Sequence, residues 1–314
     1  DRSVSRGLGD VYKRQGMGAD FYENSEIARY IFDQAGEELD LDMKELCFEE
    51  NDRLDLTEYT QAAMVTTCLA MTRVAESKGL KADITAGLSL GEYPAIAAAG
   101  GMNDMDAIRL VRKRGILMQN TVPAGEGAMC AVISMAAEEI EKVIEPIADV
   151  SVANYNCPGQ IVITGKTDAV EEAAAKLKEA GARRTIMLNV SGPFHSQMLV
   201  PAGEKLAEEL EHTRFHELRI PYVTNVTAEK VTDIRETPGL LTTQISSPVR
   251  WMQSMERMIA DGVDTFVEIG PGKTLEGFLR KIDRSVKVFH ISQWEDVDKV
   301  CTELADSGKM MEEA

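Results

Sequence analysis

Apolar residues recur at three- and four-residue intervals in several long stretches of the chain, which is the period of one face of an α-helix. The pattern predicts helices over residues 21–39, 60–79, 92–99, 106–122, 200–213, 247–262 and 273–282, and Pro248 lies near the start of the sixth. Shorter apolar or alternating runs at 83–86, 220–227, 264–270 and 287–292 predict strands. Strands that alternate with helices are typical of an α/β body built on a parallel sheet.

The middle of the chain follows a different order. Residues 127–135 alternate as a strand, 136–147 form an amphipathic helical pattern, and two strands at 149–156 and 160–165 flank a Cys-Pro-Gly turn. A helical pattern at 168–181 and a strand at 182–190 complete the order βαββαβ, which is that of a ferredoxin-like unit. We therefore predict a ferredoxin-like subdomain at 125–190, inserted into an α/β body formed by 16–124 and 191–314.

Composition narrows the class of protein. The 314 residues are 44% hydrophobic, enough for a sizeable core, and the net charge of -18 disfavours binding to nucleic acid phosphates. No apolar run reaches the length that spans a membrane, and the start of the chain lacks the apolar stretch of a secretory signal. The five cysteines lack CxxC spacing, so we expect neither disulfides nor a zinc site, and a reducing cytoplasm is the simplest compartment.

The first fifteen residues differ from the rest of the chain. They contain neither a period-2 apolar run nor a helical stripe, whereas a plausible helix start follows from Gly16 onward. The pattern indicates that residues 1–15 are either a segment foreign to the native chain or a disordered N-terminus.

Candidate chemistry first appears at Gly87-Leu88-Ser89-Leu90-Gly91, a GxSxG sequence between a short apolar strand and a small-residue helix. This context is typical of a nucleophile elbow, in which a serine on a strained turn exposes its Oγ at the carboxyl edge of the sheet. The glycines let the strand and helix approach each other, and the N–H of Leu90 is a candidate oxyanion donor at the helix N-terminus. The bland alternative is an ordinary glycine-rich turn.

A serine nucleophile needs a base, and the chain contains four histidines. His212 and His216 lie in a charged stretch typical of solvated positions, and His290 lies in an apolar strand typical of a packed residue. His195 lies in a loop flanked by turn-forming residues, where functional groups tend to concentrate. From these surroundings we select His195 as the candidate base.

Six motifs then occur in a fixed order: AGLSLGEY, LVRKRGILMQ, NYNCPGQIVITG, GPFHSQM, SPVRW and EIGPGKTL. Together they resemble the malonyl-CoA:acyl carrier protein transacylase family of fatty acid synthesis. The resemblance covers nearly the whole chain, from about Gly16 to about Ser292. It implies a hydrolase-like α/β fold with a ferredoxin-like insertion, and an enzyme that transfers a malonyl group through a malonyl-serine intermediate.

The resemblance also implies roles for individual residues. Ser89 corresponds to the nucleophile and His195 to its base, and the residue whose backbone carbonyl orients the histidine corresponds to Gln244. Arg114 corresponds to the arginine that holds the free carboxylate of the malonyl group, for which a planar guanidinium is well suited.

Two further residues are expected to line the acyl pocket, again by position in the resemblance. Phe194 corresponds to a bulky residue that favours malonyl over methylmalonyl, and one methyl group is worth only about 1–3 kcal/mol. Asn156 corresponds to a residue near the acyl site. Neither a metal nor a bound cofactor is expected for this chemistry.

The chain departs from the family at its start. The family begins with an apolar strand and a GQGxQ loop that supplies a second oxyanion donor, and Gln15 falls several residues after the place of that motif. The role is therefore not transferred to Gln15. Because that segment is absent from its expected place, one alternative is an inactive acyltransferase-like binding protein.

The implied partners are malonyl-CoA and an acyl carrier protein, with no role for nucleic acid or a membrane. The carrier is acidic in this family, so a protein with this net charge would need local cations for docking. Candidate cations are Arg183, Arg184, Arg280, Lys281 and Arg284, although scattered solvated charges are the simpler interpretation. A serine thioesterase or hydrolase is the remaining alternative, because it shares the elbow but has no need of Arg114.

Overall fold

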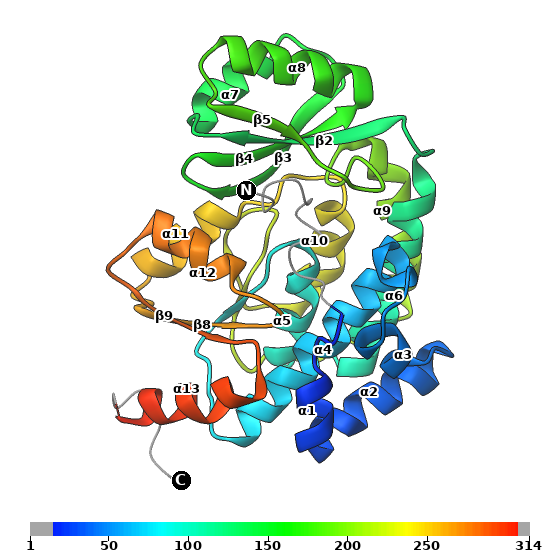
Figure 1. Ribbon diagram of the computed structural model, residues 1–314, viewed down its shortest axis with the longest axis vertical. Coiled ribbons are helices and arrows are strands. Elements are labelled where there is room, and N and C mark those ends of the chain that lie inside the picture. Colours follow the sequence, from blue (N-terminus) through cyan, green and yellow to red (C-terminus); the bar gives the residue numbers. More distant parts are fainter. Residues whose placement is uncertain (1–14, 307–314) are drawn as a thin grey trace.

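The structure is a computed structural model that describes residues 15–306 of the chain. Figure 1 shows a four-stranded sheet with two helices at one end of the molecule and a larger body of helices and short strands below it. The expectation about residues 1–15 lies outside the described residues, apart from Gln15. No helix within 15–306 is long and apolar enough to cross a membrane.

The four-stranded unit has the βαββαβ order that the sequence predicts. Its elements are β2 (Gly127–Ile133), α7 (Ala137–Ile144), β3 (Val150–Cys157), β4 (Gln160–Lys166), α8 (Thr167–Glu179) and β5 (Arg184–Met187). The strands lie in the order β3-β4-β2-β5, and all three pairings are antiparallel. This is the ferredoxin-like arrangement, and Figure 1 shows both helices on the outer face of the sheet. The exact boundaries at 125 and 190 stay a prediction.

The body contains two short sheets with parallel pairs. In the first, β1 (Thr85–Ala86) pairs in parallel with β6 (Tyr222–Val223), and β6 pairs antiparallel with β7 (Lys230–Val231). In the second, β8 (Thr265–Ile269) pairs in parallel with β9 (Lys287–Ile291). Residues of β1 and β8 both line a cavity of about 1110 Å³, so this cavity adjoins both sheets.

Helices enclose these sheets and form the main core. They are α1 (Ala19–Asn24), α2 (Glu26–Leu39), α3 (Met43–Phe48), α4 (Thr57–Ser77), α5 (Glu92–Ala98), α6 (Asp104–Thr121), α9 (Val200–Glu211), α10 (Thr237–Gln244), α11 (Trp251–Ala260), α12 (Thr274–Ile282) and α13 (Trp294–Asp306). Short 3₁₀ turns lie at Arg53–Asp55, Ser89–Gly91, Gln197–Leu199 and Ile234–Glu236. The central α4 packs against α2 and α6, and most of its side chains are buried.

Several predicted boundaries are wrong, for identifiable physical reasons. The single helix expected at 21–39 is two helices, because Ser25 adopts an extended conformation and its side chain caps α2 by accepting a hydrogen bond from the N–H of Ala28. Helix α11 begins at Trp251 rather than near Pro248, because Val249 pairs with the edge strand β3. Helices α10 and α13 were not predicted from the sequence.

Backbone pairing joins the four-stranded unit to the body. The N–H of Val249 donates to the carbonyl of Ala153 at 2.8 Å, and the N–H of Tyr155 donates to the carbonyl of Val249 at 2.9 Å. Residue 249 follows α10, so the segment that carries Gln244 is attached to β3. The two units are therefore connected close to the residues considered next.

Candidate active site

Ser89 lies on a sharp turn directly after β1, where a 3₁₀ turn leads into α5. Its φ of 51° is in the left-handed region, which costs a non-glycine residue about 1–3 kcal/mol. A Cβ on Gly87 would lie 1.9 Å from the carbonyl oxygen of Gly91, so only glycine fits at position 87. A Cβ on Gly91 would meet nothing within 4 Å, so the expectation that both glycines are sterically required is wrong for Gly91.

His195 approaches Ser89 from the loop between β5 and α9. Its Nε2 lies 2.8 Å from Ser89 Oγ, and its Nδ1 lies 2.9 Å from the backbone carbonyl oxygen of Gln244. A carbonyl only accepts, so Nδ1 carries the hydrogen and Nε2 is left to accept from the serine hydroxyl. His195 also has a left-handed φ of 60°, so both residues of this pair are held in strained backbone conformations.

The surroundings of His195 keep its imidazole neutral. The side chain is buried, and burial together with the nearby Arg114 guanidinium lowers the pKa of His195 from 6.5 to about 4. A neutral imidazole at neutral pH can accept a proton from Ser89. The arrangement therefore matches that of a nucleophile with its base, in which a main-chain carbonyl takes the place of an orienting carboxylate.

This lowered pKa predicts the pH dependence of the first chemical step. Acylation by a thioester substrate should proceed at a nearly constant rate from about pH 8 to about pH 5, and should fall only near the pKa of His195, because protonation removes the base. The rate of CoA release in the first turnover would measure this, with circular dichroism at each pH as a control for folding. An acid limb centred near 6.5, the pKa of an exposed histidine, would contradict the prediction.

Arg114, from the middle of α6, reaches the same point. The side chain is only 1% exposed, and its Nη2 donates to Ser89 Oγ at 3.1 Å. Nη1 donates to Gln61 Oε1 at 2.9 Å, and the guanidinium lies over the ring of Tyr93. A buried cation at hydrogen-bonding distance from a nucleophile can bind an anionic group on the molecule that the nucleophile attacks.

Gln244 does more than the sequence predicts. Besides accepting from His195 through its carbonyl, it donates from side-chain Nε2 to the carbonyl of Ser89 at 2.9 Å. Its Oε1 accepts from Arg114 Nη2 at 3.3 Å. The backbone and side chain of this one residue therefore contact all three of Ser89, His195 and Arg114.

Sequence reasoning missed Gln61, Glu92 and Asn225. The signal for Gln61 is a long polar side chain among the mostly apolar buried residues of α4. The signal for Asn225 is its position shortly after β6, since functional groups gather at the carboxyl ends of parallel strands. Glu92 resembles an ordinary surface acid at a helix start, yet its side chain is fully buried.

The assignment of Leu90 as an oxyanion donor stays a prediction. As the second residue of the helical turn, Leu90 has a backbone N–H without an acceptor inside that turn. The N–H of Ser89 itself donates to Asn225 Oδ1 at 2.6 Å, so it is already used. An oxyanion at this position would therefore depend on Leu90.

The two predicted acyl-pocket residues differ in their surroundings. Phe194, next to His195, packs against both the main core and a cluster on the four-stranded sheet. Asn156 lies in β3 and is fully buried, and neither atom of its amide has a hydrogen-bond partner within 15–306. An unpaired buried amide is costly, so it has hydrogen-bonding capacity available for a bound ligand. Both assignments stay predictions.

The other three histidines lie elsewhere in the body. His290 is half-buried in β9, with Nδ1 2.9 Å from Glu276 Oε2. His212 is exposed at the end of α9. His216 is half-buried and its Nε2 is buried, so the expectation that it is solvated is wrong. Neither contact of His195 involves any of them.

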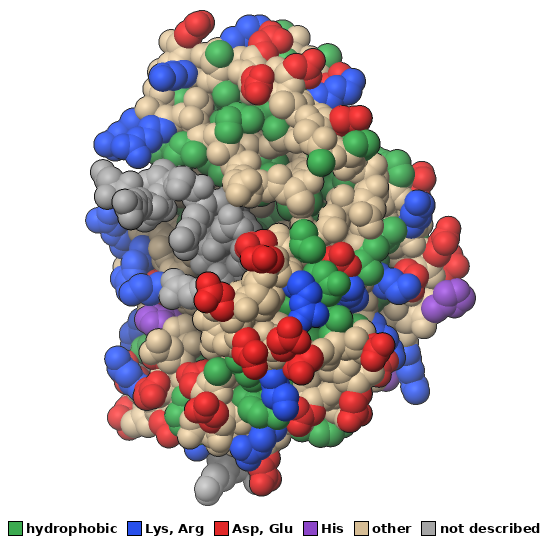
Figure 2. All heavy atoms as spheres, turned by 45° about the vertical axis from the view of Figure 1, so that its right-hand side comes forward, with side chains coloured by type: hydrophobic (Ala, Val, Ile, Leu, Met, Phe, Trp, Pro, Cys, Tyr) green, Lys and Arg blue, Asp and Glu red, His purple; other side chains and the backbone are tan. Residues whose placement is uncertain are grey.

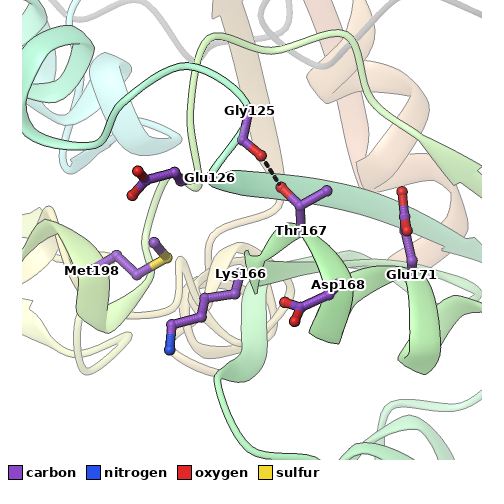
Figure 3. A pocket seen from close by; sticks show the side chains of 7 residues that line it. All are labelled: Gly125, Glu126, Lys166, Thr167, Asp168, Glu171 and Met198. Carbon is purple, nitrogen blue, oxygen red and sulfur yellow. Dashed lines mark hydrogen bonds between the residues drawn. The ribbon is translucent and has the colours of Figure 1, made fainter.

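A smaller surface pocket of about 450 Å³ is lined by residues before β2, the start of α8 and Met198. Figure 3 shows its lining, with the Thr167 hydroxyl donating to the carbonyl of Gly125. Three of its side chains are carboxylates, Glu126, Asp168 and Glu171, and its one cation, Lys166, pairs with Asp149. This charge pattern would repel an anionic substrate, and Ser89 does not line the pocket.

Comparisons with known proteins agree with this geometry. Residues 12–297 match the acyl transferase domain family. The chain is 43% identical over 288 residues to the malonyl CoA-acyl carrier protein transacylase of Bacillus subtilis, covering 90% of this chain and 91% of that protein.

Two solved structures are similar over nearly the full chain. The malonyl CoA-acyl carrier protein transacylase from Clostridium perfringens has a TM-score of 0.91 and 41% identity, with 95% of each chain covered. A malonyl-transacylase in complex with its type II PKS acyl-carrier protein has a TM-score of 0.90 and 34% identity, covering 95% of this chain and 97% of that chain.

Proposed function

The chain belongs to the acyl transferase domain family, among its malonyl-CoA:acyl carrier protein transacylases, and from this we infer its reaction and propose the residues that perform it. It transfers a malonyl group from malonyl-CoA to the phosphopantetheine thiol of an acyl carrier protein and supplies fatty acid synthesis. The observation that carries the assignment of residues is the buried contact of Ser89 Oγ with both His195 and Arg114.

In the first half of the reaction, Ser89 Oγ attacks the thioester carbonyl carbon of malonyl-CoA while its proton passes to His195 Nε2. The carbonyl oxygen becomes an oxyanion that accepts a hydrogen bond from the N–H of Leu90. The C–S bond then breaks, and the CoA thiolate takes the proton from His195. A malonyl-serine ester remains on the enzyme.

The second half repeats these steps with a different nucleophile. The carrier's phosphopantetheine thiol gives its proton to His195, and its sulfur attacks the ester carbonyl of malonyl-Ser89. The tetrahedral intermediate expels Ser89 Oγ, which takes the proton back from His195. The hydrogen bond from Nδ1 to the carbonyl of Gln244 keeps the imidazole in the same tautomer in both halves.

Arg114 selects the acyl group in this proposal. A malonyl group ends in a carboxylate two carbons from the carbonyl that Ser89 attacks, and a guanidinium can bind it with two parallel hydrogen bonds. In the absence of substrate, Gln61 and Gln244 hold the guanidinium beside Ser89. A hydrolase of neutral esters would have no use for a buried cation there, so Arg114 favours a transferase of dicarboxylic acyl groups.

We also propose a site for the carrier and a compartment. The candidate docking cations are exposed and fall into two groups: Arg183 and Arg184 at edge strand β5, and Arg280, Lys281 and Arg284 in and after α12, which contacts the opposite edge strand β3. The free state of all five cysteines supports a reducing, cytoplasmic location.

The surface charge supports local rather than general attraction of the carrier. Figure 2 shows acidic side chains spread over one face of the molecule and several basic side chains along its left-hand margin. Of the α12 group, Arg280 is already paired with Glu276 at 2.6 Å. An acidic carrier would therefore depend on the remaining exposed cations.

Product analysis tests the proposed function. Mixed with malonyl-CoA and acyl carrier protein that bears phosphopantetheine, the chain should release CoA and form malonyl-carrier, because a thiol rather than water accepts the acyl group. Mass spectrometry of the carrier and quantification of free malonate would measure the two outcomes. Malonate as the main product would indicate a hydrolase, and a folded sample that releases no CoA would indicate a binding protein.

A further inference from the structure

A buried carboxylate lies directly behind the nucleophile. Glu92 is 0% exposed, and its Oε2 accepts from the backbone N–H of Asn225 at 3.1 Å and from Gln244 Nε2 at 2.7 Å. Burying a carboxylate is costly unless hydrogen bonds or an opposite charge compensate for its lost hydration. Asn225 and Gln244 are buried as well, so both hydrogen bonds to Glu92 are shielded from water.

Asn225, the first partner, holds the strained turn at both ends. Its Oδ1 accepts from the N–H of Ser89 at 2.6 Å, and its Nδ2 donates to the carbonyl of Gly87 at 2.7 Å. These two bonds bracket the left-handed residue Ser89. Because that conformation is unfavourable by about 1–3 kcal/mol, it persists only where its surroundings enforce it.

Gln244, the second partner, has its amide orientation fixed by Glu92. The Oε2 atom of Glu92 acts as an acceptor, so it binds the NH₂ end of the Gln244 amide, which also donates to the carbonyl of Ser89. The oxygen end must then face Arg114, from which it accepts a hydrogen bond. With the amide reversed, its oxygen would face Glu92 Oε2 and its NH₂ group would face the donating guanidinium of Arg114.

We propose that Glu92 is a positioning residue for the transfer reaction: through Asn225 and Gln244 it sets the placement of Ser89 and the direction of Arg114. It touches neither the substrate carbonyl nor Ser89 Oγ in this assignment. The inference deepens the proposed function and depends on it, since it concerns the same nucleophile.

The role does not depend on the charge of Glu92. Burial raises the pKa of Glu92 to about 7, so near neutral pH the carboxyl exists in both forms. A proton on Oε1 leaves Oε2 able to accept from both Asn225 and Gln244. The necessary feature is therefore an acceptor at Oε2, and a glutamine carbonyl could supply it.

Three substitutions test this. Glu92→Met removes the acceptor and keeps the volume, and it should lower the acylation rate at saturating malonyl-CoA about 100-fold, since a displacement of about 1 Å can cost that much. Glu92→Gln keeps a carbonyl oxygen and should recover most of that loss. Glu268→Met is the matched control, because Glu268 is a partly buried carboxylate with a raised pKa that, like Glu92, accepts from backbone N–H groups, here those of Leu275 and Glu276.

The control separates positioning from folding. Glu268→Met should lower the melting temperature without slowing acylation of Ser89, measured by CoA release in the first turnover and by intact mass. The proposal is overturned if folded Glu92→Met acylates at the wild-type rate, or if Glu92→Gln is as slow as Glu92→Met.

A second variant covers the case in which Glu92→Met does not fold. Asn225→Ala removes both bonds that bracket Ser89 and should slow acylation at least tenfold, on the order expected for a misplaced nucleophile. A folded Asn225→Ala protein with the wild-type rate would also overturn the proposal. If the wild-type protein itself never acylates Ser89, the proposed function fails instead, so the two failures are distinguishable.

Discussion

Replacing Ser89 by alanine is expected to abolish the covalent malonyl-enzyme and to lower transfer to the carrier by about 10⁵–10⁶-fold, as loss of a serine nucleophile does elsewhere. The reason is that no other hydroxyl is recorded at hydrogen-bonding distance from His195 Nε2 within the described residues. Intact-mass spectrometry after mixing with malonyl-CoA measures the acyl adduct, and a coupled assay measures the transfer. Serine already bears the cost of the left-handed φ at residue 89, and alanine bears a similar cost. The substitution should therefore affect the fold only slightly.

Ser134 provides a matched control for this substitution. It too is a serine with a left-handed φ, 60°, but it follows β2 in the four-stranded unit. Ser134→Ala should therefore retain both the malonyl adduct and the transfer rate. An adduct that persists in Ser89→Ala, or that maps to a different residue in the wild-type protein, would refute the assignment of the nucleophile.

The elbow was predictable because its determinants are local. Three of them lie within ten residues of Ser89: the short strand β1, a glycine at position 87 where no side chain fits, and the start of α5. The ferredoxin-like unit was predictable for a similar reason, since its alternating and helical patterns follow one another without interruption. Its strand order then follows from that element order as the usual arrangement.

The surroundings of the nucleophile were not predictable because they depend on tertiary contacts. Asn225 lies 136 residues from Ser89 in the sequence, and only the parallel pairing of β1 with β6 brings them together. The burial of Glu92 likewise depends on Gln244 at the end of α10, a helix whose weakly periodic sequence gave no prediction. Long-range pairing of this kind has no signature in local periodicity.

Sequence patterns also could not reveal which charges are buried. Arg114 is one of several cations in α6, and the helical pattern alone does not distinguish it from Arg112. The resemblance selected Arg114, and the structure shows the difference: Arg114 faces Ser89, whereas Arg112 pairs with Glu58 at 2.7 Å and lies over the Tyr59 ring. Two arginines two residues apart on one helix therefore serve as a natural comparison.

Substitution of Arg114 should change the choice of substrate more than the chemistry itself. In Arg114→Ala the malonyl carboxylate would be buried without a partner, and truncation of one member of such a pair costs about 2–5 kcal/mol. We expect kcat/KM for malonyl-CoA to fall by about 30- to 5000-fold, which is that free energy expressed as a rate ratio. The value for acetyl-CoA, which has no carboxylate, should fall much less, so the preference between the two substrates should narrow or reverse.

Arg114→Lys and Arg112→Ala make this prediction specific. A lysine keeps the charge but cannot form two parallel hydrogen bonds, so Arg114→Lys should fall between the wild type and Arg114→Ala for malonyl-CoA. Arg112→Ala removes a cation from the same helix and should leave the ratio of malonyl to acetyl transfer unchanged, because its partners are Glu58 and Tyr59. Steady-state kinetics with both thioesters measure the ratio. An equal loss for malonyl-CoA and acetyl-CoA in Arg114→Ala would mean that Arg114 supports only the placement of Ser89, and the carboxylate would then need a different partner.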